Sequence, residues 1–267
     1  MGRVSSLFVY PMSFDEFLTA TRQEGLLRIK RNSSPTNPLP EAFYNRLVEA
    51  FRSYMLVGGM PEAVATYTET GSYRYSSDIV NEIIQGYQDD FAKYGAKANP
   101  LLLRQTLISV AHQAGAKFVC SRVEGQYRSA EVKVALEMLK DAGLIIPTYH
   151  TDANGVPLGA EINERVVKYL IHDTGVLLGI LGIDDDIDER IKEMMVADSI
   201  DLVDKGHVAE MMAGLELIKY SSPQTRHQLY YWQNMNKGTC AEVDYVIARS
   251  GSIVPIEVKS GVKGSMS

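Results

Sequence analysis

Residues 243–261, VDYVIARSGSIVPIEVKSG, contain two apolar runs that are separated by a Ser-Gly turn signal. Such a pattern predicts a β-hairpin, in which residues 243–248 fold back on residues 253–258. Three charges, Asp244, Glu257 and Lys259, interrupt the apolar runs, and the pairing brings Asp244 roughly opposite the other two. Two carboxylates in one partly buried region repel each other. The cluster is therefore favourable only with a lysine or a divalent cation beside it.

The spacing of these charges indicates a specific chemistry. An acid, twelve residues and then Glu-x-Lys in a strand is the signature of PD-(D/E)XK nucleases. We predict Asp244, Glu257 and Lys259 as catalytic residues. Asp244, Glu257 and the Val258 carbonyl would hold Mg²⁺ or Mn²⁺ against a phosphodiester, and Lys259 would orient or activate the attacking water. Glu210, on the preceding helix, is predicted as a further metal ligand. The alternative is a structural ion cluster that sets the strand register.

Composition and charge limit the class of protein. With 267 residues, 45% of them hydrophobic and 22% charged, the chain has the balance of a globular protein. The formal net charge of -6 argues against a nucleic-acid partner, but residues 184–204 hold nine acids against two bases and set that sign. There is no apolar run long enough to cross a bilayer and no signal-peptide pattern, so we expect a cytoplasmic protein without a membrane segment.

The first hundred residues are predicted to be mostly helical. After a short strand at 6–9, Ser13 and Glu16 form a capping box at the start of a helix. Further helices are expected at 41–56, from Pro61 and at 76–94. The paired glycines in VGGMPEAV end the helix at 41–56, because glycine tolerates unusual backbone angles.

Residues 100–160 have the order of a winged helix. A helix from Pro100, a short element at 118–123 and a helix at 129–143 precede two strands, LIIPTYH and VPLGAEI, which flank an Asn-Gly turn signal. In a winged helix the third helix commonly lies in a DNA groove, and Arg128 and Lys133 are at its start. These two are our candidate nucleic-acid contacts. Because basic residues are sparse and Glu131 lies between the two, a purely structural winged helix is the favoured alternative.

The chain resembles the C-terminal part of a group of bacterial and archaeal AAA-type ATPases whose last domain is similar to PD-(D/E)XK nucleases. The resemblance rests on the order of short segments, among them GRVSSLFVYPMSFDEFL, VGGMPEAV, KYLIHDTGVL, LYYWQN, AEVDYVIA and PIEVKSG. It implies an α+β, mostly helical fold in three parts: the end of an ATPase core with a helical lid at 1–99, a winged helix at 100–160, and a nuclease-like α/β domain at 161–267, related to restriction endonucleases and incomplete at its C-terminus.

The resemblance also implies the cofactors and partners. ATP and the ATPase core belong to the full-length protein, because this chain contains no GxxxxGK[ST] phosphate-binding loop and is not expected to hydrolyse ATP alone. DNA is the expected partner, and an exposed sheet edge favours a homo-oligomer. Two hypotheses follow: a DNA-associated, metal-dependent nuclease-like domain, or a non-catalytic module that binds DNA or protein.

Overall fold

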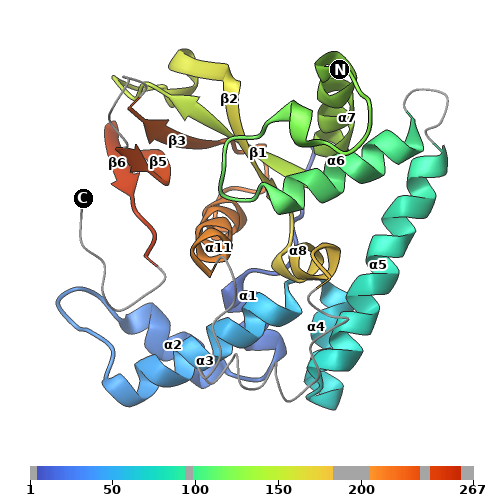
Figure 1. Ribbon diagram of the computed structural model, residues 1–267. Coiled ribbons are helices and arrows are strands. Elements are labelled where there is room, and N and C mark those ends of the chain that lie inside the picture. The colour runs from blue at the N-terminus through green and yellow to red at the C-terminus, as the bar shows by residue number, and fades with distance from the viewer. Residues whose placement is uncertain (1–4, 94–98, 183–204, 235–240, 260–267) are drawn as a thin grey trace. The chain divides into compact units, whose positions relative to one another are not determined.

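The computed structural model describes residues 5–93, 99–182, 205–234 and 241–259 (Figure 1). The predicted α+β, mostly helical fold is confirmed: these residues form nine α-helices and two small sheets. The acidic stretch 184–204 lies outside the described residues. Within the described residues, none of the helices combines the length and the apolar character that crossing a membrane requires.

The chain divides into two compact units. One comprises Met1–Val9, Phe91–His172 and Asp204–Ser267, and the other comprises Tyr10–Asp90 and Asp173–Val203. The predicted division at residues 99 and 160 stays a prediction.

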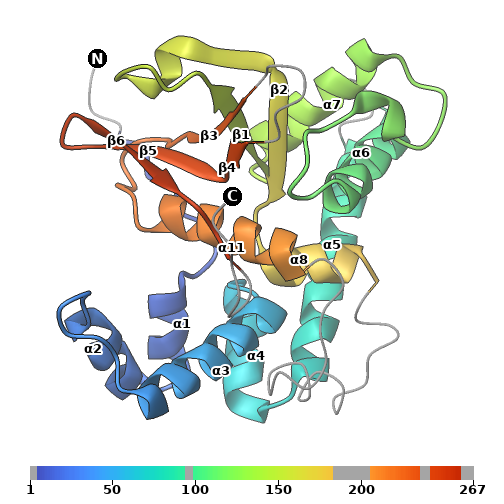
Figure 2. The same ribbon diagram turned by 60° about the vertical axis from the view of Figure 1, so that its left-hand side comes forward.

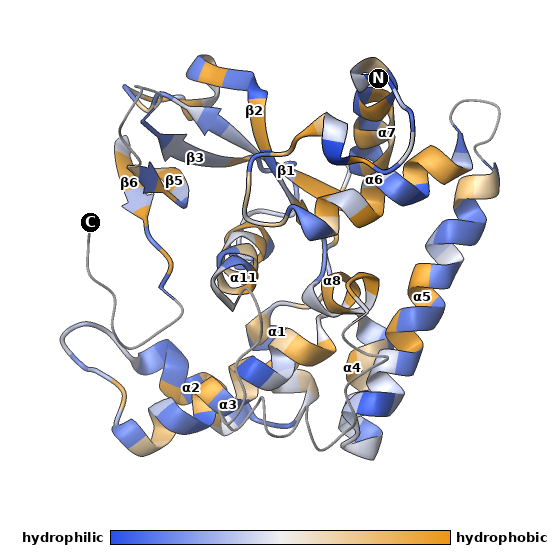
Figure 3. Cartoon of the chain, viewed as in Figure 1, coloured by the Kyte–Doolittle hydropathy of each residue, from blue (hydrophilic) through white to orange (hydrophobic). Residues whose placement is uncertain are grey.

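The second of these units is helical. Its helices are α1 (Phe14–Ala20), α2 (Glu24–Asn32), α3 (Glu41–Val57), α4 (Pro61–Thr70), α5 (Tyr73–Lys93) and α8 (Thr174–Ile180). The unit includes α5 only as far as Asp90. The capping box of Ser13 and Glu16 is present at the start of α1, as predicted. Five of the seven residues of α8 are buried, and the helix is largely orange in the hydropathy colouring of Figure 3.

The paired glycines between α3 and α4 allow a close approach to a buried acid. Asp173 caps α8 by accepting a hydrogen bond from the Val176 backbone N–H, and it accepts a second one from the Gly59 N–H at 2.6 Å. At Gly58, whose φ is +77°, a Cβ would lie 2.2 Å from the Asp173 Oδ1. Glycine is therefore required here, both by the backbone angle and by the space that Asp173 occupies.

The other unit holds both sheets. Its elements are α6 (Pro100–His112), the 3₁₀ helix η1 (Cys120–Arg122), α7 (Ser129–Asp141), β1 (Ile145–Thr151), the 3₁₀ helix η2 (Leu158–Glu161), β2 (Ile162–Ile171), α11 (Lys205–Lys219), β3 (Leu229–Gln233), β4 (Glu242–Val243), β5 (Tyr245–Arg249) and β6 (Ser252–Ile256).

Two predicted strands are absent or shifted. Residues 6–9 form no strand, and the Phe8 backbone N–H bonds to the Pro223 carbonyl instead. The segment VPLGAEI is mostly the 3₁₀ helix η2, so the strand that pairs with β1 begins only at Ile162. A short apolar run or a turn signal does not decide where a partner strand begins.

The four-stranded sheet has the order β2-β1-β3-β4, and β5 and β6 form a separate hairpin (Figure 2). β1 is antiparallel to β2 and parallel to β3, and β3 is antiparallel to β4. The registers Thr148↔Lys168, His150↔Tyr231 and Gln233↔Glu242 bring these residues to one face of the sheet. α11 packs against β2.

Candidate functional site

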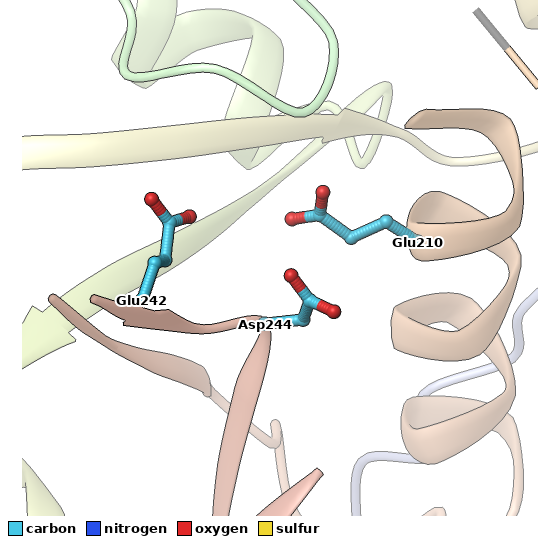
Figure 4. A group of neighbouring side chains, drawn as sticks. All are labelled: Glu210, Glu242 and Asp244. Atoms are coloured by element: carbon cyan, nitrogen blue, oxygen red, sulfur yellow. The ribbon is translucent and has the colours of Figure 1, made fainter. Parts of the chain in front are cut away.

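Three carboxylates from distant parts of the sequence converge in the sheet-bearing unit. Glu210 comes from α11, Glu242 from β4, and Asp244 from the residue between β4 and β5 (Figure 4). One carboxylate oxygen from each lies within 4.8 Å of the others. Of the predicted metal ligands, the structure thus brings Asp244 and Glu210 together and adds Glu242.

A bend in the chain places Asp244. The sequence predicts one strand through residues 243–248, but the strand changes partners at Asp244: β4 pairs with β3, and β5 pairs with β6. The hairpin itself is confirmed, with Arg249 opposite Ser252 and positive φ at Ser250 and Gly251. The Val258 backbone N–H donates a 2.7 Å hydrogen bond to the Asp244 Oδ2, which holds this carboxylate at the end of the hairpin.

A close contact between α11 and β5 places Glu210. The buried face of α11 carries mainly apolar side chains, and Glu210 lies one residue before Met211, which is fully buried. One turn later, a Cβ at Gly214 would lie only 2.4 Å from the Tyr245 Oη. The missing side chain lets Tyr245 reach α11, where its hydroxyl donates a 2.8 Å hydrogen bond to the Glu210 backbone carbonyl. Asp244 precedes Tyr245, so this packing brings Asp244 toward Glu210.

A buried lysine that the sequence analysis missed lies beside the carboxylates. Lys168 on β2 is only 3% exposed, and its Nζ is 2.8 Å from the Glu210 Oε1. It also forms an ion pair with Glu242 and lies 5.0 Å from the centroid of the Tyr231 ring. The ammonium therefore neutralises part of the charge of a cluster that contains three acids.

The surroundings shift the proton affinities of the cluster. Burial, and then the charges of Asp244 and Glu242, raise the pKa of Glu210 above its usual range, although Lys168 opposes the shift. Burial, and then the charges of Glu257 and Glu242, raise the pKa of Asp244, whereas the hydrogen bond from the Val258 N–H lowers it. Burial alone would lower the pKa of Lys168, but Glu210 and Glu242 outweigh it and raise this pKa. Each shift on the acids thus reflects burial first and the neighbouring negative charge second.

The sheet face beneath the cluster holds buried polar atoms. The Tyr231 Oη, the Thr148 Oγ1 and the His150 Nδ1 have no hydrogen-bond partner among the described residues. Burial, together with the charges of Glu242 and Glu210, raises the pKa of Tyr231, so its hydroxyl stays protonated. Buried polar groups are usually satisfied by protein or by ordered water. These atoms give the site spare hydrogen-bonding capacity next to its acids.

The remaining predicted residues lie at the surface. Glu257 and Lys259 pair with each other at 2.6 Å, and their side chains are 44% and 43% exposed. The charge of Glu257 contributes to the raised pKa of Asp244. The pKa of Lys259 is raised by its hydrogen bond to Glu257 and, to a smaller extent, by the charges of Glu257 and Asp244. Their catalytic roles stay a prediction. Arg128 and Lys133 are exposed at the start of α7, and the Arg128 backbone N–H bonds to Glu131. Their role as nucleic-acid contacts stays a prediction.

The sequence contains a signal for two further residues of the cluster, Lys168 and Glu242. Lys168 is the one charge in the apolar run VVKYLI, and a lysine inside a buried strand calls for an acidic partner. Glu242 is two residues before Asp244, a spacing that puts both side chains on one side of an extended chain.

Tyr231 on β3 is fully buried. His207 on α11 is exposed.

The fold and the cluster define a mostly helical α+β protein with a partly buried group of three carboxylates, two of which are bridged by a buried lysine. The family model described as Domain of unknown function (DUF8612) matches residues 48–187, more than half of the chain, and the chain belongs to this family. A second model, Domain of unknown function (DUF4143), matches residues 205–267, which include Glu210, Glu242 and Asp244. This second family is commonly associated with AAA-type ATPases. Comparison with curated proteins and with solved structures found no match.

Proposed function

We propose that this chain is the DNA-associated part of an AAA-type ATPase and carries a metal-dependent, nuclease-like site at Glu210, Glu242 and Asp244. The observation that carries the proposal is the convergence of these three carboxylates within 4.8 Å of one another. The match of the surrounding segment to a family that is associated with ATPases supports the wider assignment.

The chemistry of the donors fits a hard divalent cation. Mg²⁺ and Mn²⁺ prefer oxygen ligands, and all three side chains supply carboxylate oxygens. Lys168 is the only cation paired with Glu210 and Glu242 among the described residues. Three carboxylates and one ammonium leave excess negative charge, which a divalent ion would balance. Burial is the main cause of the raised pKa values of Glu210 and Asp244, and the neighbouring acids add to it.

Each residue then has a defined task. Glu210, Glu242 and Asp244 would hold Mg²⁺ or Mn²⁺, whose charge would stabilise the negative charge that develops on a phosphodiester. Lys168 keeps the Glu210 and Glu242 carboxylates oriented. Tyr245 and Gly214 set the distance of α11 from β5. Lys259 is predicted to orient or activate water, and Arg128 and Lys133 are predicted to contact the DNA backbone.

The test combines metal binding and cleavage. Binding of Mn²⁺, followed by the electron paramagnetic resonance of the free ion, is expected for the wild type and lost in Asp244→Asn. Cleavage of supercoiled plasmid and of single-stranded DNA with Mn²⁺ is measured in parallel for the wild type and for the Asp244→Ala, Lys259→Ala double variant. Equal Mn²⁺ binding by the wild type and Asp244→Asn would contradict the metal site. Metal binding without cleavage would contradict the nuclease activity alone.

One observation favours a second function, a non-catalytic module that binds DNA or protein. Lys168 already bridges two of the three acids, as in a structural ion cluster that joins β2, α11 and β4. In that case the cluster contributes stability and register, and Mn²⁺ has no specific effect. The Mn²⁺ experiment separates the two functions, because only the metal site predicts a difference between the wild type and Asp244→Asn.

A further inference from the structure

A pocket of about 640 Å³ lies on α7, β1 and β2, in the sheet-bearing unit. Tyr149 and Tyr169 line it, whereas Thr148 and Lys168, their neighbours along the strands, belong to the face with the carboxylates. Because side chains alternate along a strand, this pocket and the carboxylate cluster use opposite faces of the β1-β2 pair. The pocket is thus separate from the proposed metal site. Its volume lies in the range of small-ligand sites.

Aromatic rings supply much of the pocket wall. Phe118 and Tyr169 pack edge to face with centroids 5.6 Å apart, and Tyr149 lines the same pocket from β1. All three side chains are only half-buried, so part of each ring is open to solvent. Burial raises the pKa of Tyr149 and that of Tyr169, so both phenols are neutral at physiological pH and able to donate a hydrogen bond. Such a wall can stack against a flat ring.

The charges on the wall favour an anion. Lys133 on α7 and Arg165 on β2 are exposed, and neither side chain has an ion-pair partner among the described residues. Lys140 differs, because it pairs with Glu137. The lining therefore holds the bases Lys133, Lys140 and Arg165 and the acids Glu137 and Glu164, and its net charge is positive. Two unpaired cations on different elements can each meet a separate phosphate.

We propose that this pocket holds one nucleotide of a single-stranded nucleic acid. The base lies against the rings of Tyr149, Tyr169 and Phe118, and the phosphates on its two sides meet Lys133 and Arg165. A single strand is favoured over a duplex, because only an unstacked base offers its face to a pocket. It is favoured over a free nucleotide, because the two cations come from different elements and suit a phosphate on each side of the base. The proposal does not depend on the metal site.

The first test measures binding without metal. In EDTA and at low salt, the fluorescence anisotropy of a labelled oligothymidylate of about twelve nucleotides should rise on addition of the protein. The double variant Lys133→Glu, Arg165→Glu should bind at least tenfold more weakly, and Tyr149→Ala should also lose about tenfold or more. The control is Arg104→Glu, Arg249→Glu, which makes the same change in net charge at exposed residues outside the pocket. Equal losses in both double variants, or no binding by the wild type, would overturn the proposal.

The second test locates the strand on the protein. Cys120 lines the pocket, and Cys240, the other cysteine of the chain, is replaced in a Cys240→Ser background. The oligonucleotide should slow the reaction of Cys120 with a maleimide, and an unchanged rate at saturation would place the strand elsewhere and overturn the proposal. Competition by duplex DNA or by thymidine monophosphate at the same nucleotide concentration would equally overturn the preference for a single strand. Failure here would leave the Mn²⁺ result unaffected, because the two sites lie on opposite faces.

Discussion

The Nζ of Lys168 lies 2.8 Å from the Oε1 of Glu210, and this buried ion pair joins β2 to α11 across 42 residues of sequence. It is the contact on which the stability of the carboxylate cluster depends most directly, because the ammonium also pairs with Glu242.

Replacement of Lys168 by methionine should be strongly destabilising in the absence of metal. It leaves Glu210 and Glu242 without their counter-ion, and loss of one partner of a buried pair costs about 3 kcal/mol or more. Urea denaturation at pH 7 in EDTA measures the change. Lys259→Met is the matched control and should have little effect, because its pair with Glu257 is exposed and screened by water. The additional substitution Glu210→Gln should restore part of the loss, and strict additivity of the two changes would contradict the coupling.

Glu242 and Glu257 should differ as metal ligands. Glu242 belongs to the converging group, whereas Glu257 lies at the surface beside Lys259. Glu242→Gln should therefore weaken Mn²⁺ binding about tenfold or more, which corresponds to about 1.4 kcal/mol, and Glu257→Gln should weaken it less. Titration calorimetry on both variants decides this. The reverse order would favour the ligand set predicted from the Glu-x-Lys motif.

The metal-free protein should lose stability relative to Asp244→Asn as the pH rises. Burial and the neighbouring acids raise the pKa of Asp244 in the folded protein above the ordinary value of 3.8. The folded state therefore binds this proton more tightly than the unfolded chain, and that contribution is present at low pH and lost as the pH rises through the folded pKa. Asparagine does not ionise and can still accept the Val258 N–H. Parallel stability curves for the two proteins in EDTA, measured upward from about pH 3.5, would refute the shift.

Gly214→Ala should disturb both the fold and the site. Its new Cβ would meet the Tyr245 Oη at 2.4 Å and the Leu170 Cδ1 at 2.8 Å, so α11 must move away from β5. Overpacking of this kind costs about 1–3 kcal/mol, and it should also weaken Mn²⁺ binding, because Glu210 moves with the helix. Gly86→Ala on α5 is the control: a Cβ there meets nothing within 4 Å, and the helix should gain about 0.5–1 kcal/mol. Thermal unfolding of the two variants should change in opposite directions.

Local signals were sufficient for the helices and the hairpin. The capping box at Ser13 depends on residues three apart, and the turn at Ser250 and Gly251 depends on two adjacent residues, so both could be predicted from the sequence and are confirmed. The strand expected at 6–9 was wrong, because a short apolar run forms a strand only where a partner strand is available.

The cluster was only partly predictable for the same reason. Asp244 and Glu210 were found from the motif and the preceding helix, and they do converge. The pairing of Lys168 with Glu242 depends on the order β2-β1-β3-β4, in which two other strands separate β2 from β4. No spacing within the sequence encodes that order. The motif instead predicted Glu257 as a metal ligand, but this residue follows the end of β6 and is exposed.

The bend at Asp244 makes the length of one short segment critical. Glu242 and Asp244 reach the same cluster because a single residue, Val243, separates them in an extended chain. An insertion or deletion of one residue there would turn one carboxylate to the opposite side, although every residue of the cluster would still be encoded. Natural variants of this segment should therefore tolerate exchange of the residue at Val243 far more readily than any change in the number of residues between the two acids.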